Sequence, residues 1–292
     1  MNYIIKDHRF RFITITIALL LCSLLFSSAP GSDSKREDTG KLPFDPSEEL
    51  VYEGEFSRAL LRGINVAELR FTANRIQVSK AQPNNENAPA ALRFTLDAVT
   101  KGLLRKLFGL NFRQHIESTV EPLSFSVLQT TKLDEQGKRK RTSEAVFDKT
   151  VGRVVWTERD PNDPNREPRI VTNRMSGAVQ DIASAFYYLR TQPLVLGTNF
   201  EILISDSGQV YRIPTTVSEK KTLKTVIGKV QTLKVDVEIF GEGRLLRGKG
   251  KMSIWFTDDA RHIPVRAKIN SELGTLDITL KKITRSNVKQ AL

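Results

Sequence analysis

Cysteine is nearly absent from this sequence. The chain of 292 residues has one cysteine, Cys22, and this residue lies inside an apolar run near the N-terminus. If that run is removed, the rest of the chain has no disulfide, no thiol nucleophile and no thiolate ligand for a metal. A lipoprotein signal has a small residue before its cysteine, whereas Leu21 is large, so we do not expect lipidation.

Catalytic motifs are also missing. The sequence has no Gly-x-Ser-x-Gly elbow and no His-Glu-x-x-His helix. The glycine-bearing stretches 241–243 and 248–251 do not follow a strand and open a helix, so they do not form a phosphate-binding loop. A solvated or hydrogen-bonded side chain explains both His115 and His262. We therefore predict no catalytic residue, no metal site and no cofactor, and we expect a protein that is not an enzyme.

Long apolar runs are confined to the N-terminus. Basic residues precede an apolar and hydroxyl run, Phe12 to Phe26, and small residues follow it up to Ala29. This order is typical of a secretory signal peptide, and the run is shorter than the ~20 residues of a comfortable membrane span. We predict that residues 1–29 are a signal peptide and that the protein is exported to the periplasm or cell envelope. Retention as a membrane tether stays an alternative, because Pro30 at this position hinders cleavage.

The rest of the chain is predicted to contain one domain. Residues 30–41 lack large apolar side chains and are predicted to be a flexible linker. Residues 42–285 form the predicted domain, and residues 286–292 are a C-terminal tail. Two polar loops, Gln82–Pro89 and Asp160–Pro168, are interpreted as insertions at the surface.

A period of two residues dominates this domain. Apolar and charged residues alternate strictly from Lys234 to Ile239, which places one face of a strand in a core and the other in water. One-sided alternation favours an antiparallel sheet. Gly and Asp residues mark turns between such runs, for example at 134–137, 206–208 and 258–261. The fold class predicted is mainly β: a large antiparallel β-barrel-like or curved sheet.

One segment has the spacing of a helix. Asp181 is the expected N-cap of a helix that ends at Leu189, and such a helix covers an open edge or mouth of the sheet. Ile182, Ala185, Phe186 and Leu189 are predicted to form its buried face. Tyr187 and Tyr188 point away from that face, so they are candidates for lining a ligand cavity, with core packing as the alternative.

The stretch Lys101–Leu110 mixes apolar and basic residues. Leu103, Leu107 and Phe108 are candidate contacts to a lipid-like ligand or a membrane surface, since this composition is typical of interfacial segments. The alternative is that the segment folds back and buries its leucines.

The formal net charge is +12, and part of it is clustered. The candidate contacts to an anionic surface are Lys138, Arg139, Lys140, Arg141, Arg244, Arg247, Lys249 and Lys251. Lipid headgroups or other anionic envelope components are the predicted partners, because export disfavours nucleic acid. The alternative is that these cations protect exposed strands from pairing with other sheets.

A pattern of packing and turn residues begins with Leu50–Tyr52 and is densest from Asp181 and Ala185–Arg190 onward. It continues through Gly197, Tyr211, Gly228, Leu233–Val235, Gly248–Met252, Ile254–Phe256, Asp258–Asp259 and Pro264–Arg266. On these residues, most of 42–285, and more specifically its second half, resembles the domain of unknown function 3108 family of exported bacterial proteins. It implies an exported, β-rich, barrel-like or half-barrel fold. It implies no activity, so no catalytic residue can be transferred.

Three functions are consistent with these observations. The first is a non-enzymatic envelope binding protein with a cavity for a lipid-like or apolar ligand. The second is a structural or assembly protein that docks another envelope protein through a sheet edge or a basic face. The third is an enzyme on an envelope polymer that uses carboxylates such as Glu117, Glu121, Asp236 and Glu238. The oligomeric state is not predicted.

Overall fold

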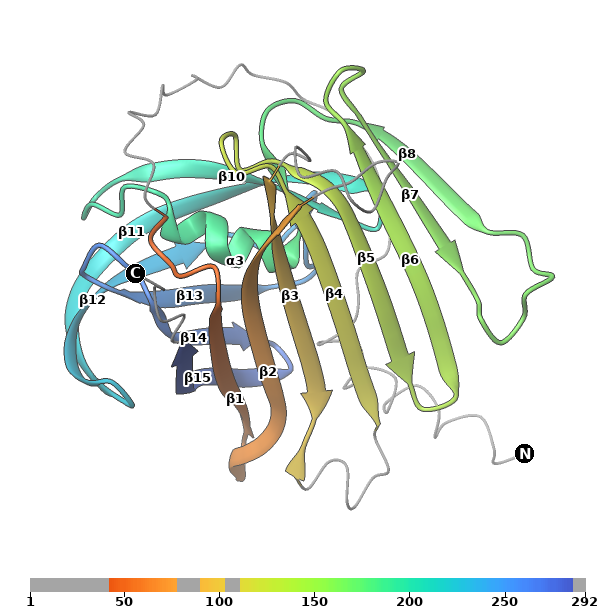
Figure 1. Ribbon diagram of the computed structural model, residues 1–292. Helices are drawn as coiled ribbons and strands as arrows, with labels where there is room; N and C mark the ends of the chain where they lie inside the picture. The colour runs from red at the N-terminus through yellow and green to blue at the C-terminus, as the bar shows by residue number, and fades with distance from the viewer. Residues whose placement is uncertain (1–41, 78–89, 103–110, 286–292) are drawn as a thin grey trace, which may run out of the picture.

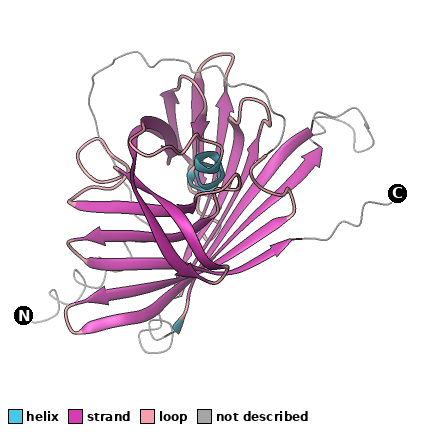
Figure 2. Ribbon diagram, turned by 90° about the vertical axis from the view of Figure 1, so that its left-hand side faces the viewer, coloured by secondary structure: helices cyan, strands magenta, loops and turns pink. Residues whose placement is uncertain are grey.

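The described part of the chain forms a single curved sheet, and the helix that it includes between two strands lies on the concave side of the sheet (Figures 1 and 2). The computed structural model describes residues 42–77, 90–102 and 111–285. The predicted signal peptide, linker, C-terminal tail, Gln82–Pro89 loop and most of the Lys101–Leu110 segment lie outside these residues. Within the described ranges, no helix has the length and apolar character that a bilayer crossing needs.

The first eight strands follow one another along the chain and form one half of the sheet. They are β1 (Glu48–Arg58), β2 (Leu61–Gln77), β3 (Ala90–Thr100), β4 (Phe112–Val120), β5 (Val127–Gln136), β6 (Arg139–Asp148), β7 (Arg153–Arg159) and β8 (Arg169–Arg174). The other half consists of β9 (Val179–Gln180), β10 (Asn199–Asp206), β11 (Gln209–Thr225), β12 (Gly228–Val237), β13 (Gly250–Thr257), β14 (Pro264–Ser271) and β15 (Gly274–Arg285). The helix α3 (Ile182–Arg190) separates β9 from β10.

Pairing of β1 with β15 joins the two halves, so the sheet runs from β8 back to β1 and then from β15 back to β9. Every pair of neighbouring strands is antiparallel except β9 and β10. The mainly β, antiparallel fold predicted from the alternation is confirmed. Hairpin turns form at the expected glycines because Gly137 and Gly208 adopt φ values of +60° and +78°, which other residues rarely adopt.

The two ends of the sheet approach each other through side chains. At the β10–β11 turn, a Cβ added to Gly208 would lie 2.9 Å from Val171 of β8, so only glycine fits there. The Asn173 side chain donates a hydrogen bond of 2.9 Å to Gln209 of β11. No strand pair connects β8 to β9–β11 among the described residues, so the barrel stays open at this seam.

Helix α3 is buried over most of its circumference because it lies inside the curve of the sheet (Figure 2). The predicted buried face was wrong in part: Ile182 is exposed and Phe186 is half-buried. Ala183, Ser184, Tyr187 and Arg190 are the most deeply buried residues of the helix, and Ala183, Tyr187 and Arg190 follow helical spacing on a different face. Sequence periodicity missed this face because it includes an arginine.

Aromatic rings fill the space between the helix and the first half of the sheet. The Tyr187 ring stacks on Phe94 with 4.2 Å between centroids, and Phe44 meets its edge at 5.0 Å. The Phe186 ring stacks on Phe71 at 3.9 Å. Contacts of this kind add to the gain from burying the rings, so the concave side is a packed core here.

Candidate functional site

The N-terminus of α3 carries a buried carboxylate that ties the helix to the sheet. Asp181 accepts a hydrogen bond of 2.8 Å from the Ser184 backbone N–H, and its own N–H donates to the Ser184 hydroxyl at 2.9 Å. The second Asp181 oxygen accepts hydrogen bonds from the hydroxyls of Ser118 on β4 and Thr130 on β5. The expected N-cap is therefore present, and it also fixes the helix against two strands.

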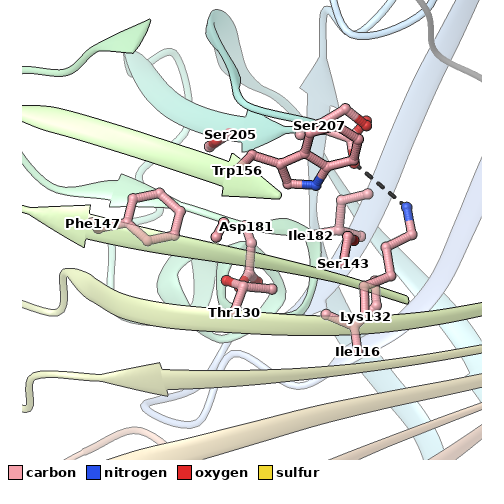
Figure 3. A pocket seen from close by; sticks show the side chains of 12 residues that line it. Ile116, Thr130, Lys132, Ser143, Phe147, Trp156, Asp181, Ile182, Ser205 and Ser207 are labelled. Atoms are coloured by element: carbon pink, nitrogen blue, oxygen red, sulfur yellow. Dashed lines mark hydrogen bonds and ion pairs between the residues drawn. The ribbon is translucent and has the colours of Figure 1, made fainter. Parts of the chain in front are cut away.

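A small cavity lies beside this carboxylate (Figure 3). Lys132 and Asp206 form an ion pair of 3.6 Å at its border, and Trp156 and Phe147 contribute apolar walls. Its volume of about 30 Å³ holds one or two water molecules. Pockets for lipid-sized ligands measure roughly 300–1,000 Å³, so this cavity is too small for a lipid-like ligand.

Tyr187 and Tyr188 are both placed against the core. Tyr187 is fully buried, and burial raises its pKa well above the ordinary value for tyrosine. Its hydroxyl has no hydrogen-bond partner within the part of the chain that the structure describes. Tyr188 is half-buried and contacts Phe125 at 5.8 Å. The Tyr187 ring is thus a core contact and lines no open cavity. The candidates Leu103, Leu107 and Phe108 lie outside the described residues.

A buried ion pair lies at the other end of α3. Arg190 and Glu48 contact each other, and their side chains are 0% and 1% exposed. Arg190 also donates hydrogen bonds to the backbone oxygens of Arg261 at 3.1 Å and Pro43 at 3.3 Å. Glutamate is almost never fully buried unless it is paired, so the burial of Glu48 depends on this contact with Arg190. Its partner comes from a helix far along the chain, so no local pattern shows it.

A groove rich in cations opens where β3, β4, β5 and β6 end. We call it the basic groove, and its volume is about 410 Å³. Its lining residues are Val99, Thr100, Asn111, Phe112, Arg113, Glu135, Gly137, Lys138, Arg139, Lys140 and Asn162. Three members of the predicted basic run thus line one groove. The fourth, Arg141, lies outside it and pairs with Asp160 at 2.5 Å.

Cations outnumber acids in this groove. Among the described residues, its lining carries four basic side chains and one carboxylate, Glu135, an excess of three positive charges. Glu135 contacts Lys140 at 3.2 Å and Arg113 at 3.8 Å. Adjacent Asp134 lies 4.0 Å from Arg139 and reduces the local excess to two. Lys138 is exposed, and no ion pair of its side chain is present among the described residues. The surplus charge favours an anionic ligand.

The second basic group lies elsewhere in the sheet. Arg244 and Arg247 belong to the loop between β12 and β13, and Lys249 and Lys251 flank the start of β13. Six strands separate β13 from β5 in the order of the sheet, so the two groups do not join. Arg244 contacts Glu238 at 3.6 Å and donates a hydrogen bond of 2.6 Å to the Arg212 backbone oxygen. None of these four residues lines the basic groove.

The carboxylates proposed for catalysis have partners that explain them. Glu117 pairs with Arg93 at 3.2 Å, and Glu238 pairs with Arg244. Burial raises the pKa of Glu121 and of Asp236, but hydrogen bonds from nearby serines outweigh burial, so both pKa values lie below the ordinary range. A general acid needs the opposite shift. None of the four lines the cavity of Figure 3 or the basic groove.

The two histidines have structural partners. The His115 ring donates a hydrogen bond of 2.8 Å to the Asp97 carboxylate on the outer face of β3 and β4. The His262 ring lies 2.9 Å from the Arg190 backbone oxygen, to which it donates. Its φ of +41° places it in a tight turn before β14. Of the two interpretations left open from sequence, a solvated or a hydrogen-bonded side chain, both histidines are hydrogen-bonded.

This architecture defines a β-barrel-like protein: an open, curved antiparallel sheet around one helix. The chain belongs to the family described as protein of unknown function (DUF3108), whose model matches residues 57–281. Among solved structures, it is similar to a beta-barrel-like protein of domain of unknown function DUF1849 from Brucella abortus. That similarity has a TM-score of 0.53 at 10% identity and covers 82% of this chain and 98% of the other. It shows the fold alone. No curated protein matches the chain by sequence.

Proposed function

We propose that this protein is a non-enzymatic binding protein of the cell envelope whose basic groove holds an anionic, phosphate-bearing component. The observation that carries the proposal is the surplus of cations in a groove of about 410 Å³. The predicted export supplies the compartment. The groove replaces the inner cavity as the ligand site, because the space beside the helix is only about 30 Å³.

Phosphate fits the groove better than a single carboxylate does. Arg113 and Arg139 bring planar guanidinium groups, which bind phosphate oxygens through paired hydrogen bonds, and Lys138 brings a point charge. Arg113 lies on β4, Arg139 on β6 and Lys138 in the turn between β5 and β6, so the pairing of these strands through β5 positions the three side chains. The enzyme alternative finds less support, since its proposed carboxylates are engaged in ion pairs or hydrogen bonds.

An NMR titration of the protein with inorganic diphosphate tests the proposal. We expect shifts of the backbone amides of Lys138–Lys140 and Arg113, and affinity that falls as salt is added. The double variant Lys138→Gln, Arg139→Gln removes two charges from the groove and should weaken binding at least tenfold. Lys224→Gln with Lys229→Gln is the matched control, because these exposed lysines face each other in the β11–β12 hairpin. Equal binding by both double variants would refute the proposal.

The assembly alternative rests on strand β8. Its one strand neighbour among the described residues is β7, and Ile170, the second residue of β8, is exposed. An edge of this kind can accept a strand from another protein, although Arg169 and Arg174 at its ends oppose pairing with a second copy. Photo-crosslinking from position 170 in intact cells tests this alternative. A specific crosslinked protein would support it, and the absence of any crosslinked protein would contradict it.

A further inference from the structure

The turn between β1 and β2 exposes two large apolar side chains. Leu60 is 98% exposed and Leu61 is 57% exposed. Arg58 and Arg62 flank them, and both arginines are exposed as well. Neither arginine forms an ion pair with an acid among the described residues. Leu60 gains almost nothing from the fold and Leu61 gains little, so these adjacent apolar side chains are available to an external partner.

The basic groove lies at the same end of the sheet as this tip. The strands β1 to β6 alternate in direction, so the β1–β2 and β5–β6 turns point the same way, toward the bottom of Figure 1. Ala67 of β2 pairs with Thr100, which lines the groove, so the β1–β2 tip extends beyond the groove by the six residues from Ala67 to Leu61. One end of the molecule thus presents the leucines and arginines at its tip, with the groove farther back on the same end.

We infer that this end docks on the surface of an anionic lipid bilayer. Leu60 and Leu61 enter the boundary between headgroups and acyl chains, while Arg58, Arg62 and the basic groove contact lipid phosphates. This inference rests on the proposed function and identifies the anionic component as the lipid of a bilayer surface. An apolar tip between cations is the pattern of interfacial membrane contacts.

The expected gains are large enough to matter. Burial of one leucine side chain strengthens binding by roughly ten- to a hundredfold, and each cation near an anionic surface adds roughly fivefold. A second copy of the chain fits this end poorly, since arginines would face arginines. A protein partner would bury the leucines too, but it would not require anionic lipid.

Fluorescence quenching by brominated lipid tests which end enters the bilayer. Leu60→Trp is expected to be quenched on brominated phosphatidylglycerol vesicles, with several-fold less quenching on brominated phosphatidylcholine vesicles. Leu123→Trp is the matched control, because Leu123 is 80% exposed in the β4–β5 turn at the opposite end of the sheet. The unsubstituted protein corrects for Trp156 and Trp255. The comparison of Leu60→Trp with Leu123→Trp holds whether the predicted signal peptide is cleaved or is kept as a membrane tether, because both variants share the same N-terminus.

The outcomes separate this inference from the proposed function. Quenching of Leu60→Trp alone, reduced by Lys138→Gln with Arg139→Gln, supports docking. Equal quenching at both ends, or none on either vesicle, overturns it. If diphosphate binds the groove while Leu60→Trp stays unquenched, the proposed function stands and docking fails. If diphosphate does not bind the groove, the proposed function fails. If Leu60→Trp is quenched equally on brominated phosphatidylcholine vesicles, which carry no anionic lipid, docking on an anionic bilayer is also overturned. Association of the protein in solution without quenching points to a protein partner instead and overturns docking.

Discussion

Arg190 and Glu48 form an ion pair that is closed to solvent on both sides. It joins the last residue of α3 to the first residue of β1, which lie 142 positions apart in the sequence. Arg190 adds hydrogen bonds to two further segments, and its guanidinium lies 5.4 Å from the Phe44 ring. The pair therefore holds the start of the domain, the helix and the β13–β14 turn in one place.

Glu48→Gln should destabilise the protein strongly, because it leaves the Arg190 charge buried without its carboxylate. The expected loss is about 3–5 kcal/mol in the free energy of unfolding, measured by urea denaturation. Glu53→Gln is the control, since Glu53 pairs with Lys281 at 3.3 Å and these side chains are 34% and 44% exposed. Its expected loss is below about 1 kcal/mol. Equal losses would contradict the assigned role of the buried pair.

Tyr187→Phe should leave stability unchanged or raise it slightly. The Tyr187 hydroxyl is buried without a hydrogen-bond partner in the described part of the chain, so its removal also removes a desolvation cost. Tyr52→Phe is the opposite case, because the Tyr52 hydroxyl donates a hydrogen bond of 2.7 Å to the Pro264 backbone oxygen. That variant should lose about 1 kcal/mol. Thermal unfolding of both proteins decides the matter, and a larger loss for Tyr187→Phe would be inconsistent with the packing described.

Asp181→Asn should weaken the attachment of α3 to the sheet. The asparagine amide keeps one acceptor oxygen and has an NH₂ group in place of the other oxygen. This NH₂ group cannot accept the hydrogen bonds that the hydroxyls of Ser118 and Thr130 donate. The expected loss is about 1–3 kcal/mol. Asp148→Asn is the control, because Asp148 caps an exposed turn through the Thr150 backbone N–H. Hydrogen exchange of the helix amides should speed up in the first variant, and unchanged exchange would show that the cap is dispensable.

The fall in the free energy of unfolding at acidic pH should depend in part on Asp236. Burial raises its pKa, but hydrogen bonds from Ser218 and Ser253 and from Lys234 outweigh burial and lower it. A carboxylate with a lowered folded-state pKa stabilises the fold above its unfolded pKa of about 4, and this contribution fades as the pH falls through the folded value. The difference in urea midpoint between the unsubstituted protein and Asp236→Asn should therefore shrink from pH 7 to pH 3. A difference in urea midpoint that stays constant from pH 7 to pH 3 would show that folding does not lower the pKa of Asp236.

The sheet could be predicted from sequence because its determinants are local. Alternation such as that from Lys234 to Ile239 and the glycines at turns act over a few residues. The Arg190–Glu48 pair could not be predicted, since it depends on how α3 lies inside the curve. For the same reason the helix periodicity favoured Ile182 over Tyr187. The residues of the basic run were visible in the sequence, whereas the groove they line with Arg113 depends on the pairing of β4 with β5.

The most direct test of the central claim is to locate an anion on the protein. Crystals soaked with tungstate, a heavy analogue of phosphate, should show an anomalous peak in the basic groove within contact of Arg113 and Lys138–Lys140, and the peak should vanish in Lys138→Gln with Arg139→Gln. A peak only at Arg244–Lys251, or none at the groove at concentrations that saturate other sites, would contradict the account.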